Sequence, residues 1–249
     1  MSISTRIKEL NKRLAQKLTA KGVEASETET MTSLINKIDN LPTGQSDIDF
    51  SIFTDWRYFS YYNNRNTLVE KLKYSDTSKG TNLSYMFSGC SRLTTVPQFD
   101  TSNGILFSNM FYGCSSLTTV PQLDTSKGTS FGNMFYGCSS LTTVPQLDTS
   151  KGTNFINMFS SCSSLTNLTI TGSINASEMD LKAATKLSKA SITSVVNALS
   201  ASASGKSITF SKTAIGSAFE TSSGAADGSA SDEWLNLIAT KSNWTISLS

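Results

Sequence analysis

One short phrase recurs every 24 residues along the middle of the chain, and it constrains the fold more than any other feature. Cys90, Cys114, Cys138 and Cys162 mark its four copies. Residues 109–128 and 133–152 are identical, and a weaker copy, YSDTSKG, ends at Gly80. A period of about 20–29 residues is typical of leucine-rich repeats. Each copy is therefore expected to form one coil that packs only against its two neighbours.

Apolar residues occupy the same positions in every copy, so stacking the coils would line them up as columns. The columns are Leu83, Phe107, Phe131 and Phe155; Met86, Met110, Met134 and Met158 with the phenylalanines that follow them; Leu93, Leu117, Leu141 and Leu165; and Val96, Val120, Val144 and Leu168. The segment LTTVPQLD is rich in β-branched residues and predicts a short parallel strand, limited by its proline. Gly89, Gly113 and Gly137 are expected to take positive φ in a turn.

The motif MFxGCSSLTxVPxLDTSxGT resembles the BspA-like leucine-rich repeat of bacterial surface proteins and gut-phage proteins. The resemblance is strong from about Thr81 to Thr171. It implies adhesion or recognition at a cell surface without naming a ligand. Together with the period, it predicts an α/β leucine-rich-repeat solenoid of 24-residue repeats and short parallel strands, with residues 81–172 as the repeat domain and an N-terminal α-helical arm before it.

Residues 1–42 predict that helical arm. Apolar residues at helical spacing predict a first helix that stops near Gly22, and Ser26 with Glu29 forms a capping box before a second helix that ends at Pro42. Such a narrow stripe is expected to need a second copy or a host surface for its burial. The predicted oligomerisation or docking residues are Ile7, Leu10, Leu14, Leu18, Leu34 and Ile38.

The segment LAQKLTAKGVEASETETMTSLINKI resembles the N-terminal part of phage tail and fibre proteins, which implies docking onto other virion proteins. Phage fibres are often trimers, so the resemblance favours a homo-oligomer without fixing its number.

The two flanks of the repeats are expected to close its ends. Residues 43–80 are rich in aromatic side chains and are interpreted as an N-terminal cap, with a sugar-stacking patch as the alternative. Residues 173–249 predict C-terminal repeats or a cap of helix–strand units. The predicted elements are a helix over Ser191–Leu199, a strand over Lys206–Phe210, a helix capped by Ser231 and a final strand over Trp244–Leu248.

The residues argue against an enzyme. The chain contains no histidine, which is the commonest general base and a frequent metal ligand. The Asp100, Asp124 and Asp148 column is expected to cap turns, with a calcium ladder or paired catalytic acids as alternatives. The cysteine column is expected to be a row of buried thiols, with disulfides or a metal site as alternatives. We therefore predict no catalytic residues, no cofactor and no metal.

Charge and hydropathy bear on partners and location. Lys and Arg total 21 against 19 for Asp and Glu, a net charge of +2 that favours neither nucleic acid nor a membrane as partner. The N-terminal residues show no apolar signal region, and no apolar stretch reaches the length of a membrane span. We therefore expect the protein on the virion surface, with a bacterial cell surface as the alternative location.

Two threonine columns are the candidate ligand-binding face. They consist of Thr94, Thr118 and Thr142, and of Thr95, Thr119 and Thr143. One column is expected to face outward, either for β-propensity and solubility or as a hydroxyl-lined face that binds a glycan or a protein.

The sequence thus predicts a non-enzymatic phage virion protein, a fibre or a tail or head decoration, that presents its repeats for host attachment. The alternative is a bacterial cell-surface leucine-rich-repeat adhesin.

Overall fold

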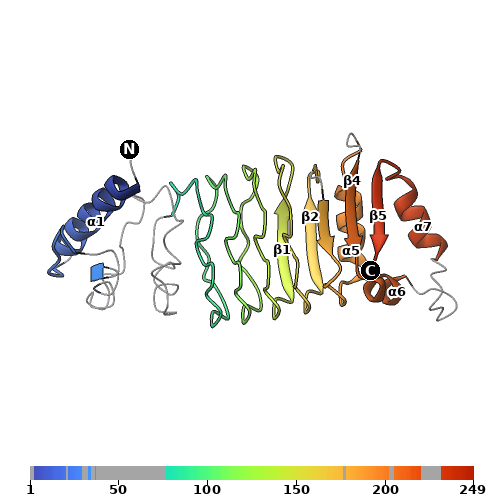
Figure 1. Cartoon of the computed structure of the whole chain (residues 1–249), viewed down its shortest axis with the longest axis horizontal. Coiled ribbons are helices and arrows are strands. Elements are labelled where there is room, and N and C mark those ends of the chain that lie inside the picture. Colours follow the sequence, from blue (N-terminus) through green and yellow to red (C-terminus); the bar gives the residue numbers. More distant parts are fainter. Residues whose placement is uncertain are drawn as a thin grey trace.

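The structure is a computed structural model, and it describes residues 3–20, 22–29, 33–34, 37, 77–175, 178–201, 205–219 and 231–249. From residue 77 onward the chain winds into successive coils that lie side by side along one axis (Figure 1). Helix α1 (Ile3–Ala20) lies at one end of the elongated molecule and helix α7 (Asp232–Ala239) at the other. This is an α/β repeat fold.

Short parallel strands join neighbouring coils. Strand β1 (Thr143–Asp148) pairs with β2 (Asn167–Thr171), and β3 (Glu178–Leu181), β4 (Lys206–Phe210) and β5 (Trp244–Leu248) form a second parallel sheet in that order. The β1–β2 register shifts between Val144 and Leu147, around Pro145, because proline has no N–H to donate. Among the described residues, the proline-containing LTTVPQLD segment forms a strand in the third copy alone, where its neighbour β2 has no proline. In the second copy this segment makes one bridge, from Thr119 to Thr143, and in the first copy it makes none to any described residue.

The apolar columns predicted from the repeat are buried, with exposures of 0–8%. The phenylalanines stack face to face along the axis. The ring centroids of Phe87 and Phe111 lie 5.2 Å apart, and those of Phe135 and Phe159 lie 5.6 Å apart. The near-parallel rings show that each coil repeats the side-chain geometry of the last.

The turns of each coil use left-handed backbone. Gly89, Gly113 and Gly137 have φ of 77°, 69° and 73°, as predicted. A second left-handed position was not predicted. Asn109, Asn133 and Asn157 occupy it with φ near 55°, since Asn tolerates this region better than other residues with a side chain. The first copy places Tyr85 there, with φ 61°.

The C-terminal elements follow the sequence closely. Helix α5 (Lys189–Ala198) begins two residues before the predicted helix and ends one residue before it does, with Leu199 as its C-cap, and β4 and β5 have the predicted bounds. The Ser231 hydroxyl accepts a hydrogen bond from the Trp234 N–H and caps α7, as predicted. Helix α6 (Lys212–Ala218), capped by Ser211, and strand β3 were not predicted. Trp234 is buried against Phe210 and Phe219 at this end.

Helix α1 ends where the sequence predicts. Gly22 has φ 79°, and the N–H groups of Gly22 and Val23 bond to the carbonyls of Thr19 and Leu18. The Ser26 N–H donates to Glu29 Oε1 at 2.6 Å, which is one half of the predicted capping box. Residues 27–29, directly after Ser26, form a turn and not the start of a helix, whereas Ser33, Leu34 and Lys37 are helical. The rest of the predicted second helix falls outside the described residues, as does the aromatic segment 43–80 apart from its last four residues. Among the described helices, none has the length and hydropathy to cross a membrane.

Candidate functional site

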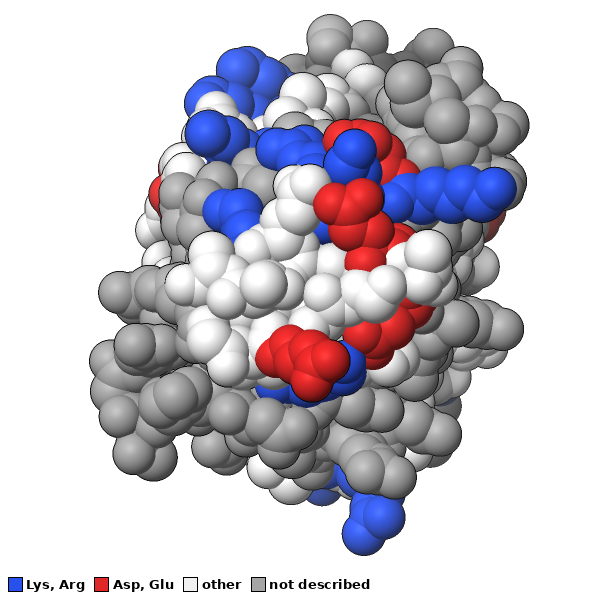
Figure 2. Space-filling view, turned by 90° about the vertical axis from the view of Figure 1, so that its left-hand side faces the viewer, with Lys and Arg blue, Asp and Glu red and all other residues white. Residues whose placement is uncertain are grey.

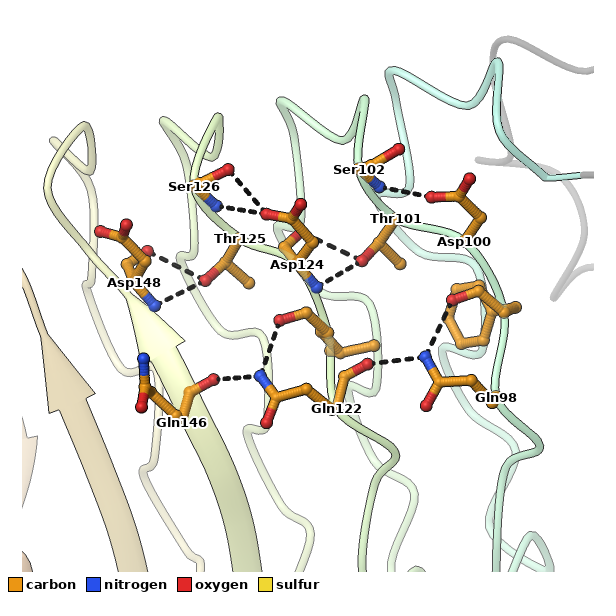
Figure 3. Close-up of a pocket in the computed structure, with 12 residues that line it drawn as sticks. Gln98, Asp100, Thr101, Ser102, Gln122, Asp124, Thr125, Ser126, Gln146 and Asp148 are labelled. Carbon is orange, nitrogen blue, oxygen red and sulfur yellow. Dashed lines mark hydrogen bonds between the residues drawn. The ribbon is translucent and has the colours of Figure 1, made fainter.

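A groove of about 870 Å³ crosses three successive coils of the repeat (Figure 3). Each coil contributes its Gln–Leu–Asp–Thr–Ser segment, or Gln–Phe–Asp–Thr–Ser in the first. The polar lining residues are Gln98, Asp100, Thr101, Ser102, Gln122, Asp124, Thr125, Ser126, Gln146 and Asp148. In each segment the apolar residue between Gln and Asp is buried, and this alternation turns Gln and Asp toward the groove.

Buried threonine hydroxyls join the coils behind the groove. Thr101 Oγ1 donates to the Asp124 carbonyl at 3.0 Å and accepts from the Asp124 N–H at 2.7 Å. Thr125 makes the same pair of bonds to the backbone of Asp148, at 2.9 and 2.8 Å. Both threonine side chains are at most 3% exposed. One hydroxyl thus satisfies both backbone groups of the aspartate in the next coil, which explains why threonine recurs here.

The aspartates cap their own turns, as the sequence predicted. Oδ1 of Asp100, Asp124 and Asp148 accepts the backbone N–H of the serine two residues on, at 2.8–3.0 Å. The Ser126 hydroxyl also donates to Asp124 Oδ1 at 2.7 Å. These bonds from Ser126, with a smaller contribution from the charge of Lys127, lower the pKa of Asp124. In the part of the chain that the structure describes, no three His, Cys, Asp or Glu residues converge as a metal site would require.

A ladder of glutamine amides forms the second row of the groove. Gln98 Nε2 donates to the Gln122 carbonyl at 2.8 Å, and Gln122 Nε2 donates to the Gln146 carbonyl at 2.7 Å. Gln146 Nε2 reaches the Thr171 hydroxyl at 3.4 Å. Among the described residues, no group donates to the three Oε1 atoms. Sequence reasoning missed this row, although its signal was available: an invariant Gln stands between two inward-facing apolar positions in three copies.

The arrangement determines what the groove offers to a ligand. The amide donors bond neighbouring coils, and the serine N–H donors bond the aspartates. What faces the ligand is mainly a repeated set of oxygen acceptors, from three amides and three carboxylates, together with the Ser102 hydroxyl, and Figure 3 shows these side chains in successive rows. The groove can accept hydrogen bonds from a ligand at equivalent points in each coil.

The predicted threonine face lies outside this groove. Thr94, Thr95, Thr118, Thr119 and Thr142 are exposed and Thr143 is half-buried, so both columns face outward where one was expected. The hydroxyls of Thr118 and Thr142 donate to the carbonyls of Thr94 and Thr118 at 3.1 and 3.0 Å. The first column is therefore engaged in bonds between coils. Its role in ligand binding stays a prediction.

The cysteine column is a row of thiols. None of the four cysteines forms a disulfide. The buried thiol of Cys114 donates to the Phe87 carbonyl at 3.0 Å, and Cys138 and Cys162 repeat this bond one and two coils further on. Burial raises the pKa of Cys138 to about 12 and that of Cys90 to about 11. The thiols stay protonated at neutral pH, so they are poor nucleophiles.

The structure corrects the interpretation of the predicted docking residues. Leu14, Leu18 and Leu34 are 0%, 1% and 0% exposed, so this chain buries them itself. The expectation that the stripe needs a second copy or a host surface is wrong for these three. The side chains of Ile7 and Leu10, together with Ile38, fall outside the described residues, and their docking role stays a prediction.

The family of the chain is shown by its repeats. A family model described as "Mycoplasma protein of unknown function, DUF285" matches residues 29–141 and 54–172, which together cover more than half of the chain. No curated protein and no solved structure matches it. The match supports the resemblance to BspA-like repeats at the level of the repeat family. The chain therefore belongs to the DUF285 family of repeat proteins.

Proposed function

We propose that this chain is a non-enzymatic phage virion protein, a fibre or a tail or head decoration, that presents a leucine-rich-repeat solenoid for host-surface recognition. The groove carries the proposal, because three coils present the same acceptors in the same positions. An active site needs unlike groups in one constellation, whereas identical groups at equal intervals suit the binding of a repetitive surface.

The stack of coils supports this role because neighbouring coils are bonded to one another where the ligand would lie. Hydroxyl, amide and thiol ladders join each coil to the next, and stacked phenylalanines fill the interior. A surface held in register in this way does not have to order itself on binding, so less conformational entropy is lost.

Attachment to the particle is assigned to the N-terminal helical arm. Lys8, Lys12 and Arg13 of α1 are exposed, while Leu14 and Leu18 are turned inward. Figure 2 shows the end of the molecule at which α1 lies, where basic side chains are prominent in the upper half with acidic side chains among and below them. This exposed polar face, and not the leucine stripe, is the part of α1 offered to other virion proteins or to further copies of this chain.

A bacterial cell-surface adhesin is the second candidate function. Membership of a family that is described as a Mycoplasma protein favours a cellular protein. The groove would serve adhesion as well as phage attachment, so the two candidates differ in location and not in chemistry.

Immunogold labelling separates the two candidates. An antibody raised against residues 81–172 is applied to lysates of the source culture, with pre-immune serum as the control. Gold on phage particles supports the virion protein, and its position separates a tail from a head location. Gold confined to cell envelopes overturns the virion proposal in favour of the adhesin.

A further inference from the structure

We infer that the groove binds a neutral, hydroxyl-rich linear glycan that lies along the stack of coils, with one sugar unit facing each coil. The inference rests on the proposed recognition function and names the ligand class of its site. It is carried by three properties of the groove: the interval at which its groups repeat, the kind of hydrogen-bonding group that it presents, and its charge.

The interval favours sugar units over a peptide. The centroids of equivalent stacked rings in successive coils lie 5.0–5.6 Å apart. Paired parallel strands lie about 4.7–4.9 Å apart, so equivalent Gln and Asp side chains in the groove repeat on a scale of about 5 Å. In an extended peptide, side chains on one face repeat every two residues, or about 6.6 Å, and lose register with the coils within three repeats. The length of one hexopyranose unit is close to the distance between successive coils. Successive units of an extended glycan therefore stay in register with the repeated side chains of the groove.

The hydrogen-bonding groups favour a ligand rich in donors, because acceptors outnumber the one serine hydroxyl, that of Ser102, that no described neighbour engages. The Gln98 and Gln122 amide nitrogens already bond the next coil at 2.8 and 2.7 Å, which leaves the Oε1 atoms to accept. Oδ1 of Asp124 is held by Ser126, and the carboxylate adds acceptor capacity alone. Sugar hydroxyls donate to such acceptors, whereas sulfate, carboxylate and phosphodiester groups are fully ionised at neutral pH and have no proton to donate.

The charge separates neutral glycans from ionic ones. Three carboxylates along the groove repel an anionic polymer. A polycation is not favoured either, because exposed Lys127 and Lys151 each follow a groove aspartate by three residues, and the charge of Lys127 acts on Asp124. These lysines offset the carboxylates and leave hydrogen bonding as the main attraction.

The test uses the full-length chain and an array of oligosaccharides in three groups: neutral glucans, galactans and rhamnans; anionic heparin and polygalacturonate fragments; and cationic chitosan oligomers. We expect binding to members of the neutral group, with affinity that rises with chain length up to three units. Binding confined to either charged group overturns the inference.

Matched variants place the ligand in the groove. Replacing Gln98, Gln122 and Gln146 together by Met removes the acceptor row at exposed positions, and we expect at least a tenfold loss of affinity for the neutral glycan. Asp180→Asn is the control, because Asp180 Oδ1 caps its turn through the Lys182 N–H in the same way but lies outside the groove. Circular dichroism checks that the triple variant stays folded. Unchanged affinity in a folded triple variant overturns the inference.

Failure of this inference is distinguishable from failure of the proposed function. If the array shows no neutral binding while labelled protein still coats host cells, recognition stands and the glycan assignment falls. If the protein binds neutral glycans through the groove while gold labels only cell envelopes, the glycan assignment stands and the virion proposal falls.

Discussion

The buried threonine ladder gives the sharpest test of how the coils are held together, through Thr101→Val. Valine matches threonine in shape, so the change opens no cavity and replaces only the hydroxyl, by a methyl group. That hydroxyl donates to the Asp124 carbonyl at 3.0 Å and accepts from the Asp124 N–H at 2.7 Å. Among the described residues, these two backbone groups make no other hydrogen bond. The substitution therefore removes the partner of both.

The expected cost follows from counting those two groups. An unsatisfied buried donor or acceptor costs about 1–3 kcal/mol of folding free energy. Because the open groove lets water reach Asp124, we expect Thr101→Val to lower the free energy of unfolding by an amount near the lower end of the sum for two groups, about 2–4 kcal/mol. Urea unfolding followed by circular dichroism measures the change as a lower midpoint at unchanged slope. Thr101→Ser keeps the hydroxyl and loses one methyl group, so it should cost about 1 kcal/mol.

Thr118→Val is the matched control within the same chain. Thr118 Oγ1 also donates to a carbonyl of a neighbouring coil, that of Thr94, at 3.1 Å. That carbonyl keeps a second donor in the Thr118 N–H, and the side chain is exposed. We expect a change within about 0.5 kcal/mol. Equal destabilisation by Thr101→Val and Thr118→Val would refute the argument that the buried ladder matters through the backbone groups it satisfies.

Four further predictions test other parts of the structure. Leu117 is 0% exposed, so Leu117→Ala should lower the free energy of unfolding by about 2–5 kcal/mol in the same urea assay. An unchanged free energy of unfolding would show that Leu117 is not part of the core. Tyr85→Asn should raise the melting temperature, by the equivalent of up to about 1 kcal/mol, because Asn tolerates φ 61° where a bulky residue is strained; a lower melting temperature contradicts this. Hydrogen bonds, that from the Lys37 ammonium first, lower the pKa of Glu29 from 4.5 to about 2. The stabilisation from this ionised carboxylate is complete above about pH 4.5 and is lost as the pH falls toward 2. Glu29→Gln should therefore make the free energy of unfolding, measured by urea unfolding at each pH, fall less between about pH 4.5 and 2 than it does in the unchanged protein. Half-buried Cys90 should react first with a thiol reagent, whereas Cys114, Cys138 and Cys162 should react only on unfolding, as mass spectrometry of labelled peptides would show.

The repeat made most of the core predictable. Columns such as Met86 to Met158 were readable because a stack of equal coils converts a sequence period directly into a spatial neighbour, with no long-range pairing to guess. Helix caps were predictable for the same local reason, as at Ser231, where a hydroxyl precedes acidic residues and an apolar stripe. The asparagine turn was equally periodic, but its left-handed φ is a backbone property that residue type only suggests.

The candidate site was harder to predict because it depends on which side of each residue faces solvent. The two threonine columns attracted attention because β-branched polar residues are dense there, yet the first column is engaged in bonds between coils. Gln98, Gln122 and Gln146 looked like ordinary surface amides. Whether these glutamines offer donors or acceptors to a ligand depends on the orientation of the side-chain amide. The nitrogen points toward the next coil and the oxygen toward the groove, and no sequence pattern encodes that orientation. The leucines of α1 were misjudged for a related reason, since helical spacing identifies an apolar stripe but not what packs against it.

The same bonds that hold the coils together determine the chemistry of the groove. When a Gln side chain donates its amide N–H to a neighbouring coil, its Oε1 atom remains available to accept a hydrogen bond from a ligand. When a serine N–H caps a turn, it occupies one carboxylate oxygen of the aspartate and leaves the other oxygen available. A protein that used these donors for a ligand would lose contacts between coils, so stability and specificity favour the same arrangement. Adding a copy of the repeat would therefore lengthen the core and the groove together, and a ligand with one more unit should gain affinity from it. An inserted coil that stabilises the chain without extending its preferred ligand would show that the two properties are separate.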